Sequence, residues 1–299
     1  MIRPESPKER LFFTTALIQC ANANYEWSGT GFFVRVAVVN EPDHLILVTN
    51  RHIASSATFG DADDIEFITP AADPSDTTRP LLGQRARAVT SGVKFELHPD
   101  PDVDVAVARV DNLIATGQPT RYVKAIPMEI LHNEYLVERL DAIEQVTFIG
   151  YPQGFYDQIN MLPVARQGWT ATPMSIDYEG RPVFLVDASV FEGSSGSPVF
   201  ALNSGAYQER AGAAHYGSPY AVFLGIIADG WDIPASGKAQ IGNTSFDVDM
   251  RQAFNFGTVY KASTIVEAIN HLLSVQGLVL DSPNPGPHET SVWPVDPPG

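Results

Sequence analysis

Short apolar runs, separated by clusters of turn-forming residues, recur along most of this chain, and this pattern predicts a β-rich fold. Phe32 to Val39 and Leu45 to Thr49 are apolar and β-branched, and the Asn-Glu-Pro-Asp cluster at 40–43 separates them, which predicts a hairpin. The segment from Ala71 to Pro80 is rich in Pro, Asp and Thr and is expected to be a loop. Further strands are expected at 65–68, 86–93, 103–110, 146–151, 183–188, 198–200, 222–227 and 257–260.

Two segments have helical rather than strand-like patterns. Met128 to Leu140 is expected to be a helix that connects two β units. Thr264 to Glu267 has the spacing of a capping box, and the apolar residues at 265, 269, 272 and 273 predict one face of a helix that ends at Gly277. We therefore expect a first β-barrel over 11–115, a connection over 116–145, a second barrel with a C-terminal helix over 146–277, and a Pro-rich tail over 278–299.

Composition narrows the class of partner. The chain has 299 residues and a formal net charge of −16, which argues against nucleic acid and membrane surfaces as partners, because both attract clustered Lys and Arg. The single cysteine, Cys20, excludes an intramolecular disulfide and favours a cytoplasmic protein over a secreted or periplasmic one. Cys20 itself is expected to be a small buried strand residue.

The N-terminus allows two interpretations. The apolar run Leu11 to Ile18, followed by Ala-Asn-Ala at 21–23, resembles a signal peptide with a cleavage site. However, Glu5 and Glu9 precede the run and two threonines interrupt it, so we favour a strand.

Three separate fragments carry residues that fit nucleophilic catalysis. Ser195 lies between small residues in the segment 192–200 (Glu-Gly-Ser-Ser-Gly-Ser-Pro-Val-Phe), where a substrate carbonyl could approach. His52 follows an apolar strand, and Asp104 precedes the run Val-Ala-Val at 105–107. The order His, Asp, Ser differs from the orders of subtilisin-type enzymes and α/β-hydrolases and is that of chymotrypsin-type enzymes. Asp102 is the alternative acid.

Five fragments carry a resemblance to trypsin-like (chymotrypsin-fold) serine peptidases of the disulfide-free bacterial type. They are 29–33 (Gly-Thr-Gly-Phe-Phe), 49–52 (Thr-Asn-Arg-His), 104–107 (Asp-Val-Ala-Val), 193–198 (Gly-Ser-Ser-Gly-Ser-Pro) and 148–152 (Phe-Ile-Gly-Tyr-Pro). The resemblance covers about residues 11–275. It implies a mainly β protein with two antiparallel six-stranded β-barrels, a C-terminal α-helix and an active site between the barrels.

This chemistry assigns roles to the candidate residues. His52 would take the proton of the Ser195 hydroxyl and return it to the leaving amine, and Asp104 would orient the imidazole. The backbone N–H groups of Gly193 and Ser195 would form the oxyanion hole. Ser194 replaces the aspartate that some family members pair with a newly cut N-terminus, so we expect no activation by N-terminal cleavage.

Specificity depends on positions that the resemblance identifies. Ser189 would lie at the base of the primary pocket, and its lack of charge predicts small or apolar residues before the scissile bond. Gly230 would lie at the pocket mouth, with Asp229 as a possible acidic rim, and the insertion between Trp231 and Ala253 could reshape the pocket.

The leading interpretation is a serine endopeptidase that acts on a peptide or protein substrate. The alternatives are a catalytically silent peptidase fold that binds a peptide or a regulatory protein partner, and a structural subunit that acts through its Pro-rich tail. The spacing of His, Cys, Asp and Glu indicates no metal site, and no cofactor is expected.

Overall fold

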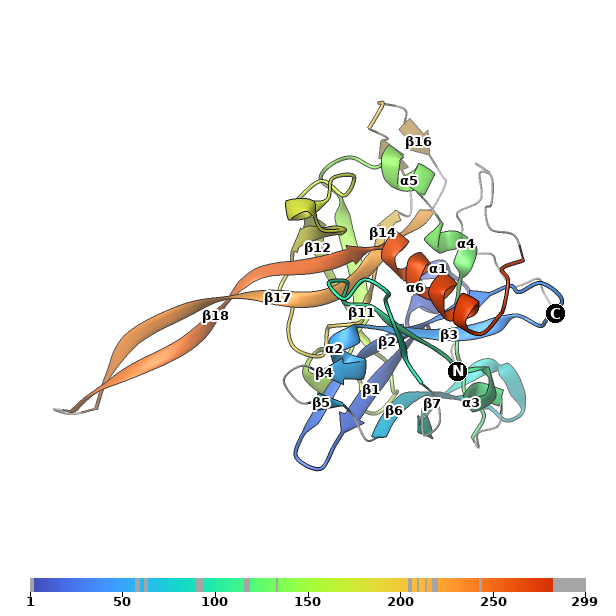
Figure 1. Ribbon diagram of the computed structural model, residues 1–299, viewed down its shortest axis with the longest axis horizontal. Helices are drawn as coiled ribbons and strands as arrows, with labels where there is room; N and C mark the ends of the chain where they lie inside the picture. The colour runs from blue at the N-terminus through green and yellow to red at the C-terminus, as the bar shows by residue number, and fades with distance from the viewer. Residues whose placement is uncertain are drawn as a thin grey trace.

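The computed structural model describes residues 3–56, 60–61, 64–89, 94–115, 119–132, 134–203, 206–208, 210–212, 214–216, 220–241 and 244–281. The protein is mainly β, with two sheets side by side and a C-terminal helix that lies across them (Figure 1).

The first half of the chain forms an eight-stranded sheet. Its strands are β1 (Thr15–Ala21), β2 (Glu26–Val36), β3 (His44–Thr49), β6 (Asp64–Asp73), β7 (Asp76–Val89), β8 (Glu96–Leu97), β9 (Ala106–Arg109) and β10 (Ile126–Pro127). They follow the order β7-β6-β1-β2-β3-β9-β8, and β10 pairs with β2. This half also contains three short helices, α1 (Pro7–Leu11), α2 (Arg51–Ala54) and α3 (Asp111–Ala115). A separate short pair of strands is formed by β4 (Ser55–Ser56) and β5 (Gly60–Asp61).

The N-terminal apolar run ends in a central strand of this sheet. β1 pairs with β2 on one side and with β6 on the other, and Ala16 and Ile18 are fully buried. This arrangement agrees with the strand interpretation of the N-terminus.

The second half of the chain closes into a six-stranded barrel. Its order is β11-β12-β13-β18-β17-β14, formed by β11 (Gln145–Gly150), β12 (Val164–Thr170), β13 (Val183–Asp187), β14 (Pro198–Asn203), β17 (Tyr220–Ile241) and β18 (Thr244–Lys261). Two short 3-10 turns lie between its strands, η1 (Pro152–Gly154) and η2 (Tyr178–Gly180). A separate two-stranded sheet is formed by β15 (Ala206–Gln208) and β16 (Ala214–Tyr216).

One hydrophobic core joins the two halves. Phe32 of β2 and Phe223 of β17 are both fully buried and lie 5.7 Å apart between ring centroids. The C-terminal helix α6 (Ala262–Val275) adds Ile265 and Ile269 to the same core. Because this core spans both sheets, the loops that meet between them are held in a fixed relation.

Two helical expectations need correction. The segment 128–140 is two short helices, α4 (Met128–Leu131) and α5 (Glu134–Arg139), rather than one. The N-cap of α6 is Lys261, and Thr264 donates its hydroxyl to the Lys261 carbonyl (2.8 Å) instead of capping an N–H group. The C-terminal end agrees with expectation, because Gly277 has a φ of +72°.

The prediction of a loop over the whole segment from Ala71 to Pro80 is wrong, because β6 and β7 continue into this segment and form a hairpin. The turn needs only residues 74 and 75. Asp73 makes it possible, since its carboxylate accepts hydrogen bonds from the Ser75 backbone N–H (2.9 Å) and hydroxyl (2.6 Å).

The insertion between Trp231 and Ala253 is a long two-stranded ribbon. The strands β17 and β18, expected only at 222–227 and 257–260, continue to Ile241 and back from Thr244. Figure 1 shows this ribbon projecting far beyond the rest of the molecule.

None of the helices in the described ranges is long and apolar enough to cross a membrane. Residues 282–299 of the expected Pro-rich tail lie outside the described residues.

Candidate active site

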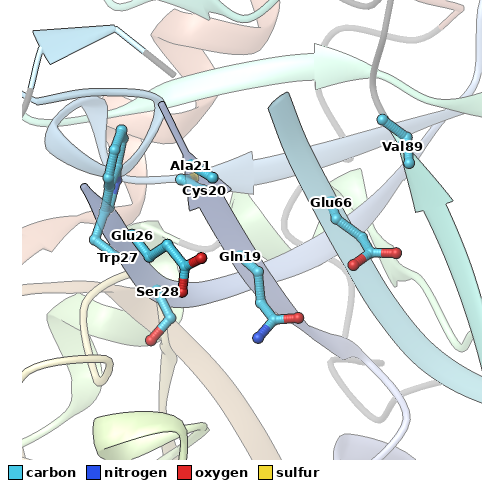
Figure 2. A pocket seen from close by; sticks show the side chains of 8 residues that line it. All are labelled: Gln19, Cys20, Ala21, Glu26, Trp27, Ser28, Glu66 and Val89. Atoms are coloured by element: carbon cyan, nitrogen blue, oxygen red, sulfur yellow. The ribbon is translucent and has the colours of Figure 1, made fainter. Parts of the chain in front are cut away.

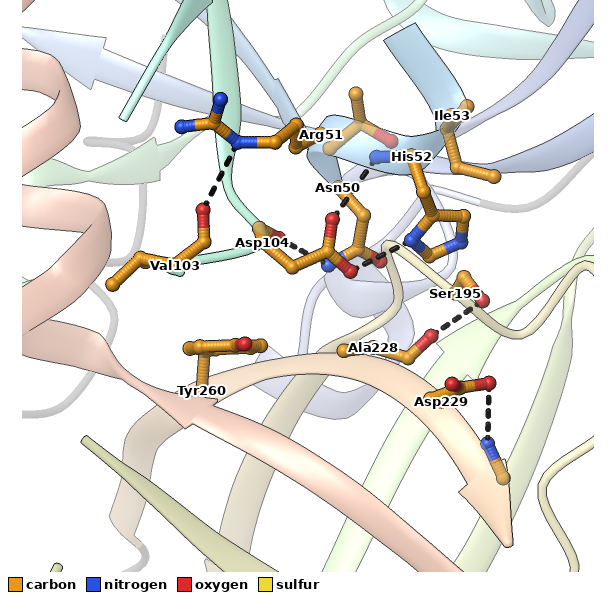
Figure 3. A network of polar contacts seen from close by, with 12 residues as sticks. Asn50, Arg51, His52, Ile53, Val103, Asp104, Ser195, Ala228, Asp229 and Tyr260 are labelled. Atoms are coloured by element: carbon orange, nitrogen blue, oxygen red, sulfur yellow. Dashed lines mark hydrogen bonds and ion pairs between the residues drawn. The ribbon is translucent and has the colours of Figure 1, made fainter. Parts of the chain in front are cut away.

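His52 and Asp104 are brought together by the pairing of β3 with β9. Thr49, the last residue of β3, lies opposite Ala106 of β9, so the residues just after β3 lie beside those just before β9. His52 Nδ1 lies 2.7 Å from Asp104 Oδ2, and the His52 backbone N–H donates to Asp104 Oδ1 (3.0 Å) (Figure 3). This two-point contact fixes the orientation of the imidazole.

Two residues that the sequence analysis did not assign hold this pair in place. Asn50 is fully buried, and its side-chain amide donates to the Asp104 carbonyl (2.7 Å). Arg51 donates to the carbonyls of His98 (2.5 Å) and Val103 (3.3 Å). Both lie within two residues before His52 in the sequence, but nothing in the local pattern shows which distant carbonyls they bind.

Asp102, the alternative acid, is engaged elsewhere. Its backbone N–H donates to Asp100 Oδ1 (2.9 Å), and its carbonyl accepts from the Tyr260 hydroxyl (3.0 Å). The carboxylate that contacts His52 is therefore that of Asp104.

The electrostatics of the site raise the pKa of His52. Partial burial lowers the pKa of His52, but the hydrogen bond and charge of Asp104, together with the charge of Asp229, raise it more, so the net pKa lies above its usual value. The side chain of Asp229 reaches the surface, yet the surrounding protein displaces enough water to raise the pKa of this carboxyl, against the opposing effect of His52.

Ser195 lies beside the middle of β2 and next to β17. The backbone N–H of Thr30 donates to the Ser195 carbonyl (2.8 Å), and the Ser195 hydroxyl donates to the carbonyl of Ala228 (2.7 Å) rather than to His52. The residue is drawn on the side of the imidazole away from Asp104 (Figure 3). A rotation about the Cα–Cβ bond of Ser195 redirects its hydroxyl.

The loop before Ser195 leaves N–H groups available for an oxyanion. The Glu192 carbonyl accepts from the backbone N–H of Gln153 (2.5 Å), and the planar trans peptide then directs the N–H of Gly193 to the opposite side. Within the described ranges, the backbone N–H groups of Gly193 and Ser195 have no backbone acceptor. Gly193 has a φ of +81°, and a Cβ there would lie 2.6 Å from the Tyr151 carbonyl, so only glycine fits.

Thr30 is a further residue that sequence reasoning quoted but did not assign. Its hydroxyl donates to the Gly193 carbonyl (2.9 Å) and accepts from the Tyr151 N–H (3.0 Å). Its own carbonyl accepts from the Thr49 hydroxyl (2.8 Å), three residues before His52. Thr30 thus connects the loop of the nucleophile to the strand that carries the histidine.

The two serines beside the nucleophile are buried. Ser194 and Ser197 are each 1% exposed, and neither hydroxyl has a hydrogen-bond partner among the described residues. Ser197 is not among the non-glycine residues with a positive φ, as expected for a serine that replaces glycine here. Gly150 provides the space, because a Cβ at that position would lie 2.1 Å from Ser197 Oγ.

The residue expected at the pocket base is uncharged and only partly buried. The Ser189 hydroxyl donates to Asn255 Oδ1 (3.0 Å) of β18. Val190 is 8% exposed and fills the space beside Gly230 and Gly257, since a Cβ on Gly257 would lie 2.5 Å from Val190 Cγ2.

An open hollow of about 530 Å³ lies on the first sheet (Figure 2). Gln19, Glu26, Trp27 and Glu66 contribute to its lining, together with Cys20. Burial raises the pKa of the Cys20 thiol to about 12, so this sulfur is not a nucleophile. In the part of the chain that the structure describes, no group of three or more His, Cys, Asp or Glu residues could hold a metal ion.

The comparisons with known proteins define the class of this protein. The trypsin-like peptidase domain family matches residues 29–206, and the chain therefore belongs to this family. No curated protein matches the chain.

Several solved structures are similar to it. They include the thermostable serine protease AL20 from an extremophilic microorganism, which is 14% identical with a TM-score of 0.47 and covers 88% of this chain and 98% of its own. A serine endoprotease from Yersinia pestis is 15% identical with a TM-score of 0.44, and the match covers 92% of this chain and 73% of that protein. The protease Anisep from Arthrobacter nicotinovorans is 13% identical with a TM-score of 0.46, and the match covers 88% of this chain and 96% of that protein.

Proposed function

We propose that this protein is a serine endopeptidase that uses Ser195, His52 and Asp104. The observation that carries the proposal is the contact of His52 with both carboxylate oxygens of Asp104, through Nδ1 (2.7 Å) and the backbone N–H (3.0 Å). A histidine held in this way presents Nε2 as its free nitrogen, which is the atom that a general base needs.

The reaction would proceed in two halves. As His52 Nε2 takes the proton of the Ser195 hydroxyl, Oγ bonds to the substrate carbonyl carbon, and the carbonyl oxygen becomes an oxyanion near the N–H groups of Gly193 and Ser195. The imidazolium then returns its proton to the leaving amine, which leaves an acyl group on Ser195. A water molecule repeats the sequence and releases the acid.

An uncharged pocket base would make small or apolar residues the preferred ones before the scissile bond. Ser189, the residue expected there, offers no charge to a lysine or arginine. An unpaired buried cation would lose several kcal/mol, roughly, which is a preference of orders of magnitude.

Covalent labelling tests the proposal. A fluorophosphonate probe reacts only with an activated serine, so we expect the purified protein to be labelled, and the Ser195→Ala and His52→Ala variants not to be. Ser194→Ala is the matched control, because its buried hydroxyl makes no hydrogen bond among the described residues. Equal absence of labelling in all four proteins would show that the fold acts as a binding module instead.

A further inference from the structure

The ribbon formed by the outer parts of β17 and β18 has one apolar and one polar face. Successive side chains of a strand point to opposite faces, and residues paired across the ribbon share a face. The pairs are Ile233 with Gln252, Ala235 with Met250 and Gly237 with Val248. The apolar face carries Ile233, Ala235, Phe246, Val248 and Met250, with Gln252 as its polar exception. The opposite face carries Asp232, Ser236, Lys238, Asp247, Asp249 and Arg251.

The apolar face is not covered by any described part of the chain. Ile233 is 45% exposed, Phe246 49% and Met250 56%. A two-stranded ribbon without a packed face is marginally stable in water, and contiguous exposed apolar surface of this kind marks a binding site.

This face continues into the catalytic centre. Asp229 pairs with Thr258, so their side chains share one face of the sheet, and the Trp231 indole N–H donates to the Thr258 hydroxyl (3.0 Å). Trp231 therefore points toward the Thr258 side of the sheet, near Asp229. The pairing is irregular between Gly230 and Asp232, and the regular ribbon that carries Ile233 begins directly after it. Asp229 in turn is close enough to His52 to raise the pKa of the imidazole.

The backbone edge of the ribbon is less suitable for binding than its face. Pro234 lies within β17 and has no N–H group, which interrupts the row of donors that an added strand would need. A ligand would therefore contact the apolar side chains of the face.

The geometry of the proposed reaction selects the part of a substrate that would lie here. The leaving amine must reach His52, which returns the proton, whereas the acyl half stays on Ser195, whose hydroxyl contacts β17 at Ala228. The chain that precedes the scissile bond would therefore lie beside β17, the strand that continues past Asp229 and Trp231 into the ribbon.

We propose that the apolar face of the ribbon is an exosite that binds an extended, apolar stretch of polypeptide substrate on the N-terminal side of the scissile bond. This inference rests on the proposed function. It predicts that the preferred substrates are unfolded or partly unfolded proteins, because apolar stretches are buried in folded ones.

The size of the face favours a peptide over a second copy of this chain. The strand from Trp231 to Ile241 is about 33 Å long at roughly 3.3 Å per residue, which matches about ten extended residues. Two such ribbons packed face to face would bury less than the roughly 1,200 Å² of a stable interface. The net charge of −16 also repels a second copy.

The test compares two fluorogenic peptides with identical residues around a scissile bond chosen from a peptide library. One ends four residues before that bond, and the other continues for about ten more residues, with leucine at alternate positions. We expect the long peptide to have about tenfold higher kcat/KM, through a lower KM, because it gains apolar contacts. Ile233→Asp and Met250→Asp should bring the ratio of kcat/KM for the long peptide to kcat/KM for the short peptide close to one. Ser236→Asp, which adds the same charge to the opposite face, should leave this ratio at its wild-type value.

Binding is measured separately from catalysis. Fluorescence anisotropy with the Ser195→Ala variant should show that the long peptide binds and that Met250→Asp added to this variant weakens binding about tenfold. If the wild type hydrolyses nothing but this binding is present, the proposed function fails while the exosite stands. The exosite would be overturned if the ratio of the two kcat/KM values were near one in the wild type or equal in all variants. It would also be overturned by a dimer in sedimentation that Met250→Asp dissociates.

Discussion

The proposed catalytic centre and the ribbon are adjacent along β17, but they are built in opposite ways. At the centre, Thr30, Asn50 and Asp104 are each hydrogen-bonded to residues far away in sequence, and Thr30 and Asn50 are fully buried. In the ribbon, contacts are almost entirely between the two strands, and Met250 is 56% exposed. Along the chain, only Gly230 separates Asp229, beside His52, from Trp231, where the ribbon begins.

This difference suggests a division of labour. Proton transfer requires groups held within fractions of an ångström, so the centre needs dense, long-range bonding. Capture of varied apolar segments requires surface area and tolerance rather than fixed geometry. Mutations in the first region should therefore affect turnover and stability strongly, and those in the second should affect only the use of long substrates.

The largest effect is expected at the acid. Asp104→Asn keeps the shape of the side chain but favours the wrong imidazole tautomer, so we expect kcat to fall by about 10⁴-fold. Asp102→Asn is the matched control, since the bonds of that residue with Tyr260 and Asp100 use its backbone. Steady-state kinetics on one peptide measures both. Equal losses in the two variants would contradict the assignment of Asp104.

A smaller but still large effect is expected at Thr30. Thr30→Val keeps the volume but leaves the Gly193 carbonyl and the Tyr151 N–H without their partner, which should destabilise the protein by about 1–3 kcal/mol. Because Gly193 belongs to the oxyanion loop, kcat should also fall, by roughly tenfold.

The control for this substitution is Thr69→Val. The Thr69 hydroxyl is equally buried but has no hydrogen-bond partner among the described residues, so the same change should be neutral or stabilising. Urea unfolding and steady-state kinetics on both variants provide the comparison. Similar losses for both would show that Thr30 acts through packing alone.

The sequence predicted the parts of the molecule that local patterns encode. The strands around Phe32, Leu47 and Phe223 follow from apolar, β-branched runs, and the three candidate catalytic residues follow from short motifs and their order. The bond between Thr30 and Gly193 joins residues 163 positions apart, and no local pattern indicates such a contact.

The ribbon was missed for a different reason. Its strands contain Gly237, Ala239, Asp247 and Asp249, residue types that are rare in strands, so their β propensity is low. They form strands because β17 and β18 pair with each other from the barrel outward. The loop expected over 71–80 was too long, because the Asp73 side chain closes the reversal within residues 74 and 75 and the strands continue to either side of them.

A third prediction tests the electrostatic link between the two regions. The negative charge of Asp229 raises the pKa of His52, so Asp229→Asn should lower it. Catalysis requires the neutral imidazole, and the acidic limb of kcat/KM should therefore move to lower pH in this variant. Asp249→Asn, on the polar face farther along the ribbon, should leave the limb in place. An unchanged limb in both variants would show that Asp229 does not influence the imidazole.

The smallest effect is expected for stability in the ribbon. Met250→Ala removes a side chain that is 56% exposed and should change the free energy of unfolding by less than about 0.5 kcal/mol. The same substitution at Met174, which is 5% exposed and packs in the core of the second barrel, should cost about 2–5 kcal/mol. Denaturant unfolding at two protein concentrations measures both. A large, concentration-dependent loss for Met250→Ala would mean that another copy covers the ribbon, and the contrast between a bonded centre and an open exosite would then be wrong.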